Sequence, residues 1–351
     1  MTNPPGFSPN TPPLASFRSG IFLNRRHLSP EAYQKICLVN LVLVSLIIVT
    51  GAAVRLTGSG LGCPDWPTCE GMKVLDPSSY HAAIESGNRA LTGLVSLGVI
   101  VATLGALVRV PGRRDLFWLS IGLVGGILVQ IVVGALVVIL ELDPISVIVH
   151  FLASILLVWC AVVLLFQSHR LDIPLAGTEA DETEGNSDGR ETRFTHGPAP
   201  LQGFRSSSSR QAVLVWTLVR LIFLLASILL VLGTMVTGSG PHAGDELADR
   251  LGYVLRDVTR IHSLAAWVLT GVLLLLAWIV RKGKDPVIVG VRSSLFWLGG
   301  AVVFQMAVGY AQYAMELPPL LVGVHVVGAT LVWIATVFLN LRVPQRSVVT
   351  D

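Results

Sequence analysis

The chain has 351 residues, of which 52% are hydrophobic and only 13% are charged. This balance excludes an ordinary soluble domain and predicts a polytopic membrane protein that contacts lipid. The net charge of +3 is small for this length and gives no reason to expect a nucleic-acid partner.

Eight stretches are apolar over the roughly 20 residues that a helix needs to cross the hydrocarbon of a bilayer. They lie near residues 36–54, 85–108, 116–140, 146–166, 212–236, 256–280, 291–314 and 320–340. The fold class is therefore predicted to be all-α, with eight transmembrane helices.

A block of residues in the first half of the chain recurs in the second half. Six identities share an offset of 175 residues, with Gln130, Gly134, Glu141, Leu142, Pro144 and His150 matching Gln305, Gly309, Glu316, Leu317, Pro319 and His325. An internal repeat predicts two copies of one unit, here a four-helix bundle. Because each unit holds an even number of spans, we expect a parallel repeat. The prolines of the two matching turns are expected to end spans three and seven.

The domain organisation follows from these spans. We expect a cytoplasmic tail at 1–35, an N-terminal bundle at 36–166, a linker at 167–211, a C-terminal bundle at 212–341 and a second tail at 342–351. The linker is predicted to be disordered because it has few large apolar residues. Lysines and arginines after the even-numbered spans predict that both termini are cytoplasmic, in a protein of the cell membrane.

Two cysteines, Cys63 and Cys69, lie in the connection between spans one and two. The predicted topology puts this connection on the outer side, where disulfides form and persist. A disulfide is our first interpretation, and free redox-active thiols are the alternative. Zinc would require more ligands than this loop supplies. The other two cysteines, Cys37 and Cys160, lie within spans and are interpreted as small apolar fillers.

Three histidines lie inside the predicted spans, at similar distances from the outer surface. His150 begins span four, His262 begins span six and His325 begins span eight. Ionisable side chains in hydrocarbon are costly, and they usually face a bundle interior or a cofactor. A lone histidine could be a hydrogen-bonded bridge between helices, but three at matching places favour a heme.

The two halves differ at the fourth matching place, because Asn88 in span two stands where span six has His262. In the second half, His262 and His325 could ligate one heme iron on both faces, which suits electron transfer. In the first half, His150 faces an asparagine. This arrangement would leave one axial position open for oxygen or for a substrate.

Glu85 precedes Asn88 by three residues and shares its helical face. Its carboxylate is expected to point into the open site and to donate or accept protons there. An ion pair with the neighbouring Arg89 is the alternative. The guanidinium of Arg89 is also a candidate partner for a heme propionate.

Two segments carry the motifs of a known family, VRLTGSGLGCPDWP at 54–67 and IESGNR at 84–89. Together with the histidines, they make the chain resemble the heme A synthases, membrane enzymes of cytochrome oxidase biogenesis, from about residue 36 to 343 outside the linker. The resemblance implies two four-helix bundles, with heme b as cofactor in the C-terminal half and heme O as substrate in the N-terminal half. It also implies that successive hydroxylations convert the C8 methyl group of heme O to the formyl group of heme A.

The resemblance also implies the site residues. These are His262 and His325 for the iron of heme b, His150, Asn88 and Arg89 for the substrate heme, Glu85 for catalysis, and Cys63 with Cys69 for a disulfide. Many members of the family have a second histidine where this chain has an asparagine. We therefore expect a divergent subgroup.

Two other functions fit the same residues. A diheme electron-transfer cytochrome would hold two hemes without oxidising a substrate. A heme-handling assembly protein would depend more on the cysteine pair than on Glu85. For the synthase, the expected partners are heme O, membrane lipid, an electron donor that the sequence does not identify, heme O synthase and cytochrome oxidase assembly factors.

Overall fold

The computed structural model describes residues 27–170, 210–282 and 286–343. These residues form eight long helices and one short 3-10 helix, η1 (Glu70–Met72). The long helices are α1 (Pro30–Leu56), α2 (Tyr80–Val108), α3 (Arg114–Ile139), α4 (Pro144–Ser168), α5 (Arg210–Ser239), α6 (Leu255–Val280), α7 (Pro286–Ala314) and α8 (Pro319–Arg342). Most of the two expected tails and of the expected linker lies outside the described residues.

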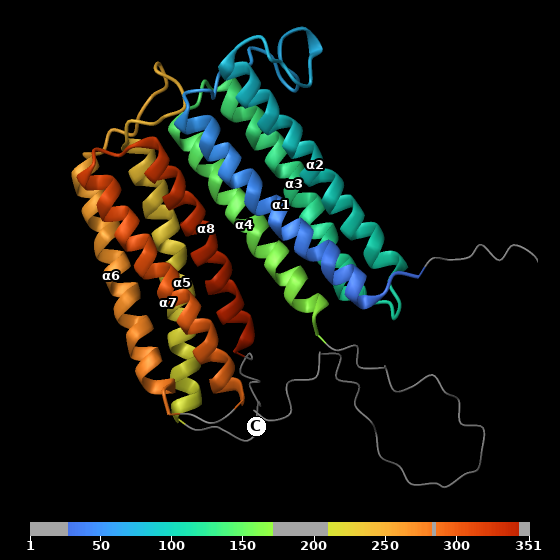
Figure 1. Ribbon diagram of the computed structural model, residues 1–351, viewed down its shortest axis with the longest axis vertical. Helices are drawn as coiled ribbons and strands as arrows, with labels where there is room; N and C mark the ends of the chain where they lie inside the picture. Colours follow the sequence, from blue (N-terminus) through green and yellow to red (C-terminus); the bar gives the residue numbers. More distant parts are fainter. Residues whose placement is uncertain (1–26, 171–209, 283–285, 344–351) are drawn as a thin grey trace, which may run out of the picture.

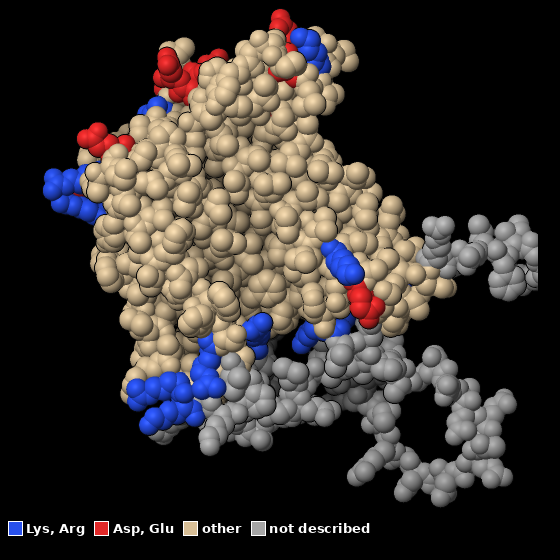
Figure 2. Space-filling model, viewed as in Figure 1, with Lys and Arg blue, Asp and Glu red and all other residues tan. Residues whose placement is uncertain are grey.

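The eight long helices of the described part are all apolar enough to cross a membrane, which confirms the predicted spans and the all-α fold class. Figure 2 shows a middle band almost free of charged side chains on the visible face. Most of the visible Lys and Arg lie at one end of this band, and most of the visible Asp and Glu lie at the other. The chain is therefore a multi-pass membrane protein.

The helices pack as two four-helix bundles, as the repeat predicts (Figure 1). In the first bundle α1, α2, α3 and α4 contact one another in sequence, and α4 closes the ring against α1. The second bundle closes in the same way from α5 to α8. The bundles meet where α1 and α4 contact α8 and where α4 contacts α5. Short connections between antiparallel neighbours are typical of this architecture.

The connections α3–α4 and α7–α8 are built alike. Their central residues have positive φ angles of 50° and 65° at Glu141 and Leu142, and of 61° and 62° at Glu316 and Leu317. This left-handed backbone lets the N–H of Leu142 donate to the carbonyl of Val137 at 2.9 Å, and the N–H of Leu317 to that of Gln312 at 2.7 Å. Such bonds satisfy carbonyl groups at the end of a helix.

The two prolines begin the helix after each turn and do not end the helix before it. Helices α3 and α7 already end at Ile139 and Ala314, whereas Pro144 and Pro319 are the first residues of α4 and α8. The prediction that they end spans three and seven was therefore wrong. A proline is well suited to the first helical position, because the N–H that it lacks would have no partner within the helix.

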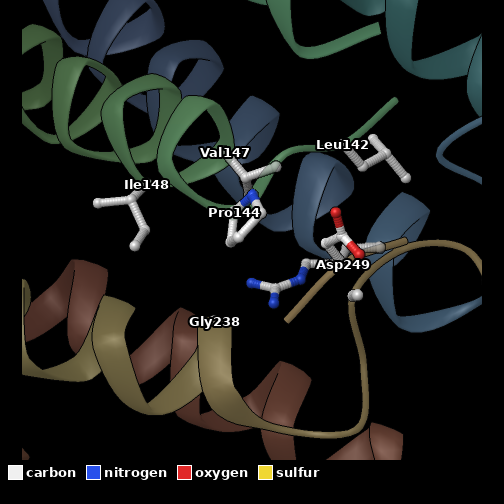
Figure 3. Close-up of a pocket in the computed structure, with 8 residues that line it drawn as sticks. Leu142, Pro144, Val147, Ile148, Gly238 and Asp249 are labelled. Atoms are coloured by element: carbon white, nitrogen blue, oxygen red, sulfur yellow. The ribbon is translucent and has the colours of Figure 1, made fainter. Parts of the chain in front are cut away.

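The bundles are tied together at the end of the molecule that carries the loops 57–79 and 240–254, here called the loop end. A small cavity lies there between α1, the α3–α4 turn and the end of α5 (Figure 3). Arg55 lines it and donates from Nη2 to the carbonyl of Thr237 at 2.7 Å. Nearby, the N–H of Gly60 donates to the carbonyl of Gly244 at 2.9 Å. A Cβ atom on Gly60 would lie 2.8 Å from Cδ1 of Leu142 and 3.1 Å from the carbonyl oxygen of Gly244, so glycine leaves room for this close approach.

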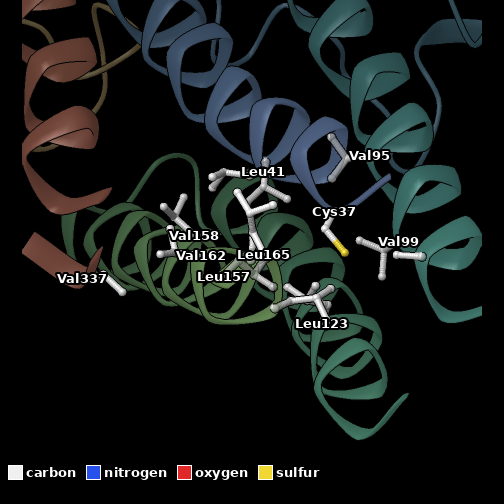
Figure 4. Packing of buried hydrophobic residues seen from close by; sticks show 14 of the residues in the cluster. Cys37, Leu41, Val95, Val99, Leu123, Leu157, Val158, Val162, Leu165 and Val337 are labelled. Carbon is white, nitrogen blue, oxygen red and sulfur yellow. The ribbon is translucent and has the colours of Figure 1, made fainter. Parts of the chain in front are cut away.

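The core of the first bundle is apolar and continues into the second bundle (Figure 4). Leu41, Leu123 and Leu157 meet there beside Cys37, which is a free and fully buried thiol. The position of Cys37 is the one expected of a small apolar filler. Val337 of α8 belongs to the same cluster.

A tryptophan joins the two bundles in this core. Trp333 of α8 donates from Nε1 to the carbonyl of Ile155 in α4 at 3.1 Å. Its ring centroid lies 5.2 Å from that of Phe223 in α5. The tryptophan is only 6% exposed, and burying its aromatic area with its N–H satisfied favours a fixed arrangement of the bundles.

Candidate functional site

The C-terminal bundle brings two of the predicted site histidines face to face. His262 lies two turns into α6 and His325 two turns into α8, and both helices start at the loop end. Their ring centroids are 6.4 Å apart, with an angle of 63° between the ring planes. The sequence offset therefore identified residues that the fold places together.

A glycine on the neighbouring helix lies against each of the three intramembrane histidines. A Cβ atom on Gly309 of α7 would be 3.2 Å from Cε1 of His325. The corresponding distance is 3.3 Å from Gly134 of α3 to His150, and 3.3 Å from Gly233 of α5 to His262. These contacts are tight for a side chain, so glycine makes room for each imidazole. The sequence alone does not predict this role for any of the three glycines.

A glutamine fixes the helix turn that carries the histidine in each bundle. Gln305 of α7 donates from Nε2 to the carbonyl of His325 at 2.9 Å. Gln130 of α3 donates to the carbonyl of His150 at 3.2 Å and to Oγ of Ser154 at 2.7 Å. The repeated glutamines therefore bridge adjacent helices, and a buried amide that does so restrains their register.

The surroundings of the histidines test whether they are structural bridges. The Nδ1 atoms of His150, His262 and His325 are all buried and have no hydrogen-bond partner among the described residues. A histidine kept only to bridge two helices would have its polar atoms paired, because an unpaired buried group costs free energy. Hydrogen bonding therefore does not explain the Nδ1 atoms, although the His262 ring also has a hydrogen bond to the backbone of Leu229 in α5.

The paired histidines fit a heme iron held from both faces. With metal–nitrogen bonds of about 2 Å and roughly 1 Å from nitrogen to ring centre, two opposed imidazole centroids would lie about 6 Å apart. The observed 6.4 Å agrees with this separation. The described residues contain no cluster of three or more His, Cys, Asp or Glu suited to a metal ion. The C-terminal bundle thus presents two opposed histidines, whose spacing is the one that two axial ligands of one heme would need.

We expect the Gly309→Ala variant to lower the heme affinity of the C-terminal bundle roughly tenfold, as changes beside metal ligands commonly do. The added methyl group would push against the imidazole of His325. Heme content and the reduced-minus-oxidised absorbance spectrum of purified protein measure this effect. Gly299→Ala is the matched control. Gly299 lies on the same helix as Gly309, and a Cβ atom added there would have no neighbouring atom within 4 Å. Unchanged heme content in Gly309→Ala would show that the contact does not position the histidine.

The N-terminal bundle keeps one histidine, and its α2 carries Asn88 at the place that corresponds in sequence to His262 of α6. His150 of α4 has a glycine and a glutamine as neighbours at the places that correspond to those beside His325. Asn88 of α2 accepts a hydrogen bond on Oδ1 from the hydroxyl of Thr50 in α1 at 2.7 Å. Sequence analysis had not linked Thr50 to this position.

Glu85 lies one turn before Asn88 and binds the loop that follows α1. Its Oε2 accepts the N–H of Cys63 at 2.7 Å, and its Oε1 accepts Nη2 of Arg89 at 2.5 Å. The residue is 5% exposed. The ion pair that sequence analysis gave as the alternative is thus present. A buried carboxylate of this kind is held by both a charge and a peptide donor.

Arg89 completes the attachment of this loop to α2. Its Nη1 donates to the carbonyl of Asp65 at 2.7 Å and to that of Thr68 at 2.9 Å. Cys63 and Cys69 are joined by a disulfide, which confirms the first interpretation of this pair. The loop is therefore closed on itself and fastened to the helix that carries Glu85.

The far end of the same loop is fastened by Asp76. Its backbone N–H donates to Oγ of Ser86 at 3.0 Å, and its carboxylate accepts the N–H of Ser78 at 3.1 Å. The bonds from Ser78, and then the approach of Lys73, lower the pKa of Asp76 below its usual value. The carboxylate is thus ionised at neutral pH and holds the chain leading into α2.

These features define a class, the polytopic helical membrane proteins that carry histidines inside paired four-helix bundles, with a two-histidine site in one bundle only. The family model described as COX15-CtaA, cytochrome oxidase assembly protein, matches residues 34–83 and 74–337. The chain belongs to this family.

Curated relatives with similar sequences are named heme A synthase. Those of Geobacillus thermodenitrificans and Exiguobacterium sibiricum are 30% identical over 129 residues and 32% identical over 112 residues, covering 35% and 32% of this chain. That of Geobacillus kaustophilus is 29% identical over 119 residues, or 33% of this chain. The matched segments cover 40%, 38% and 37% of these relatives, in the order named. The chain thus spans well under half of the length of the curated relatives it matches.

Proposed function

We propose that this protein is a heme A synthase, an oxidoreductase that converts the C8 methyl group of heme O to a formyl group. The observation that carries the proposal is the opposed pair His262 and His325 in one bundle, in a chain of the cytochrome oxidase assembly family. The names of the curated relatives support it. The reaction is taken to proceed by successive hydroxylations through an alcohol.

In this proposal the two bundles have separate tasks. His262 and His325 would hold heme b, and when bound this group supplies one-electron transfer. His150 would hold the iron of the substrate heme O, with Asn88 and Arg89 in the same site. The apolar bundle would exclude bulk water from the reacting methyl group.

Glu85 is proposed as the catalytic acid or base. Its carboxylate lies one turn from Asn88 and is ion-paired with Arg89, so a proton could be taken up or released at the oxygen atoms of this pair. General acid–base catalysis by a positioned carboxylate is commonly worth about 10²- to 10⁴-fold in rate. The electron donor, heme O synthase and cytochrome oxidase assembly factors are the proposed partners.

We also propose that the loop end faces outward and that both termini are cytoplasmic. Acidic side chains gather at the loop end, whereas Arg109, Arg113, Arg170 and Lys282 lie at the opposite end of the helices. Cytoplasmic ends of membrane spans are enriched in Lys and Arg. A disulfide at the loop end agrees with an oxidising compartment.

The proposed function is tested by extracting hemes from membranes that contain a heme O source, with and without this chain. Heme A that is formed only when the chain is present would establish the reaction. If heme O persists unchanged while the folded protein carries heme b, the enzymatic proposal fails and an electron-transfer or assembly function takes its place.

A further inference from the structure

We propose that the N-terminal bundle binds its heme iron through His150 alone, and that Asn88, oriented by Thr50, presents its amide N–H to the opposite face of that heme. This inference rests on the proposed function, because the iron concerned is that of the substrate. It adds a coordination state and a hydrogen-bonding residue that set this bundle apart from the C-terminal one.

The first step is the equivalence of His150 and His325. Each imidazole lies against a glycine of the preceding helix, and each has its backbone carbonyl bound by a glutamine of that helix. Each has a buried Nδ1 without a partner among the described residues. Because the two imidazoles have the same kinds of contacts, we infer the same function for both. The geometry of His325 fits an axial ligand of a heme iron.

The second step is the chemistry of Asn88, which stands where the other half has His262. Imidazole nitrogen suits iron, whereas amide oxygen suits hard cations such as calcium and magnesium. The amide oxygen accepts the hydroxyl of Thr50 at 2.7 Å, a shorter contact than the 3.3 Å from the same hydroxyl to the carbonyl of Ile47. The amide nitrogen makes no hydrogen bond to any residue that the structure describes, and it is not one of the fully buried unpaired atoms. Asn88 can therefore donate a further hydrogen bond, whereas its oxygen is a poor ligand for iron.

The third step is that Thr50 accompanies Asn88. The motif Thr-Gly-Ser-Gly at 57–60 recurs at 237–240, an offset of 180 residues. With this offset Thr50 corresponds to Leu230 in α5, so the half with two histidines has an apolar residue at this place. The hydroxyl occurs in the same half as the amide that it orients. A fixed donor beside an open axial face would hydrogen-bond a small ligand there.

The experiment uses the full chain, produced with a heme O source and purified without oxygen so that heme O is not consumed. Electron paramagnetic resonance of the ferric protein separates high-spin from low-spin iron, and extraction identifies the hemes. We expect low-spin heme b and high-spin heme O in the unmodified chain. Asn88→His should convert the heme O signal to low-spin, and Asn88→Leu should leave it high-spin.

The donor role is read from the affinity of cyanide for the high-spin iron. Loss of one hydrogen bond predicts a dissociation constant about threefold to tenfold higher in Asn88→Leu and in Thr50→Val. Ser45→Ala is the matched control, because its hydroxyl lies on the same helix and binds only the carbonyl of Leu41 within that helix. Unchanged cyanide binding in both test variants would overturn the donor role.

The results distinguish a failure of single-histidine binding from a failure of the proposed heme A synthase function. Low-spin heme O in the unmodified chain, together with heme A production in aerobic cells, would overturn single-histidine binding and leave the proposed function intact. Absence of heme O from the purified protein, with no heme A in the cells, would overturn both.

Discussion

We expect the His262→Ala and His325→Ala variants to purify with less than roughly a tenth of the heme b that the unmodified chain carries. Each change would remove one of the two imidazoles proposed to hold the iron, whose ring centroids lie 6.4 Å apart. It also removes the ring that lies against Gly233 or Gly309. Heme b per protein, measured by extraction and absorbance of purified protein, gives the result.

Two control variants locate the effect. His150→Ala should retain most of the heme b, because this histidine belongs to the other bundle. His81→Ala should retain it as well, since His81 lies at the start of α2 and its Nδ1 is bonded to Oγ of Ser59 at 2.9 Å. If His150→Ala lost heme b while His325→Ala kept it, the assignment of the two bundles would be reversed.

The repeat made much of this architecture predictable. A polar residue recurring at one offset inside two apolar segments needs a common reason, so His150 and His325 were identifiable before any helix was placed. The same offset marked Gln130 and Gln305, which bind the carbonyls of those histidines. Span boundaries were predicted within six residues, because hydrocarbon thickness limits the length of each apolar stretch.

Gly233 shows what the repeat could not reveal. This glycine lies in α5, outside the repeated block, and contacts His262 of the next helix. Which residue of α6 contacts Gly233 depends on how far the two helices are rotated about their axes. A single sequence does not determine this rotation. Gly134 and Gly309 did stand in the repeated block, but their repetition indicated importance without indicating a contact.

The surroundings of Glu85 were only partly predictable for a related reason. Helical spacing predicts that Glu85 and Asn88 share a face, and both lie in α2. The contact with Cys63 depends on the path of the loop after α1, which folds back onto α2. Gly62 allows this approach, because a Cβ atom there would lie 2.5 Å from the carbonyl carbon of His81. Hydrophobic periodicity carries no information about such a path.

The second large effect that we expect is the loss of heme A production in Glu85→Gln, by at least about 100-fold. Glutamine keeps the size of the side chain and an oxygen acceptor for the N–H of Cys63, so the loop should stay in place. It cannot exchange a proton at neutral pH or neutralise the charge of Arg89. Heme A formed per folded protein, with heme b content as the folding check, measures the change.

Arg89→Gln distinguishes a chemical role of Glu85 from a structural one. This variant loses the bonds to Asp65 and Thr68 as well as the ion pair, so it weakens the loop attachment more than Glu85→Gln does. If Glu85 only fastened the loop, Arg89→Gln would lose at least as much heme A production. Because Arg89 also belongs to the proposed substrate-heme site, we expect Arg89→Gln to lose some heme A production, but less than Glu85→Gln loses, although Arg89→Gln is the less stable variant to heating.

Asp76→Asn provides the matched control for the loop itself. It weakens a second carboxylate anchor of the same loop, at a place where Ser78 and Lys73 are the partners of the carboxylate. Its heme A production should stay within about twofold of the unmodified chain, because asparagine keeps an oxygen acceptor for the N–H of Ser78 and an ion pair with the half-exposed Lys73 contributes little. If Asp76→Asn lost as much heme A production as Glu85→Gln, the reaction would depend on the position of the loop. The carboxylate of Glu85 would then have only a structural role, in holding that loop.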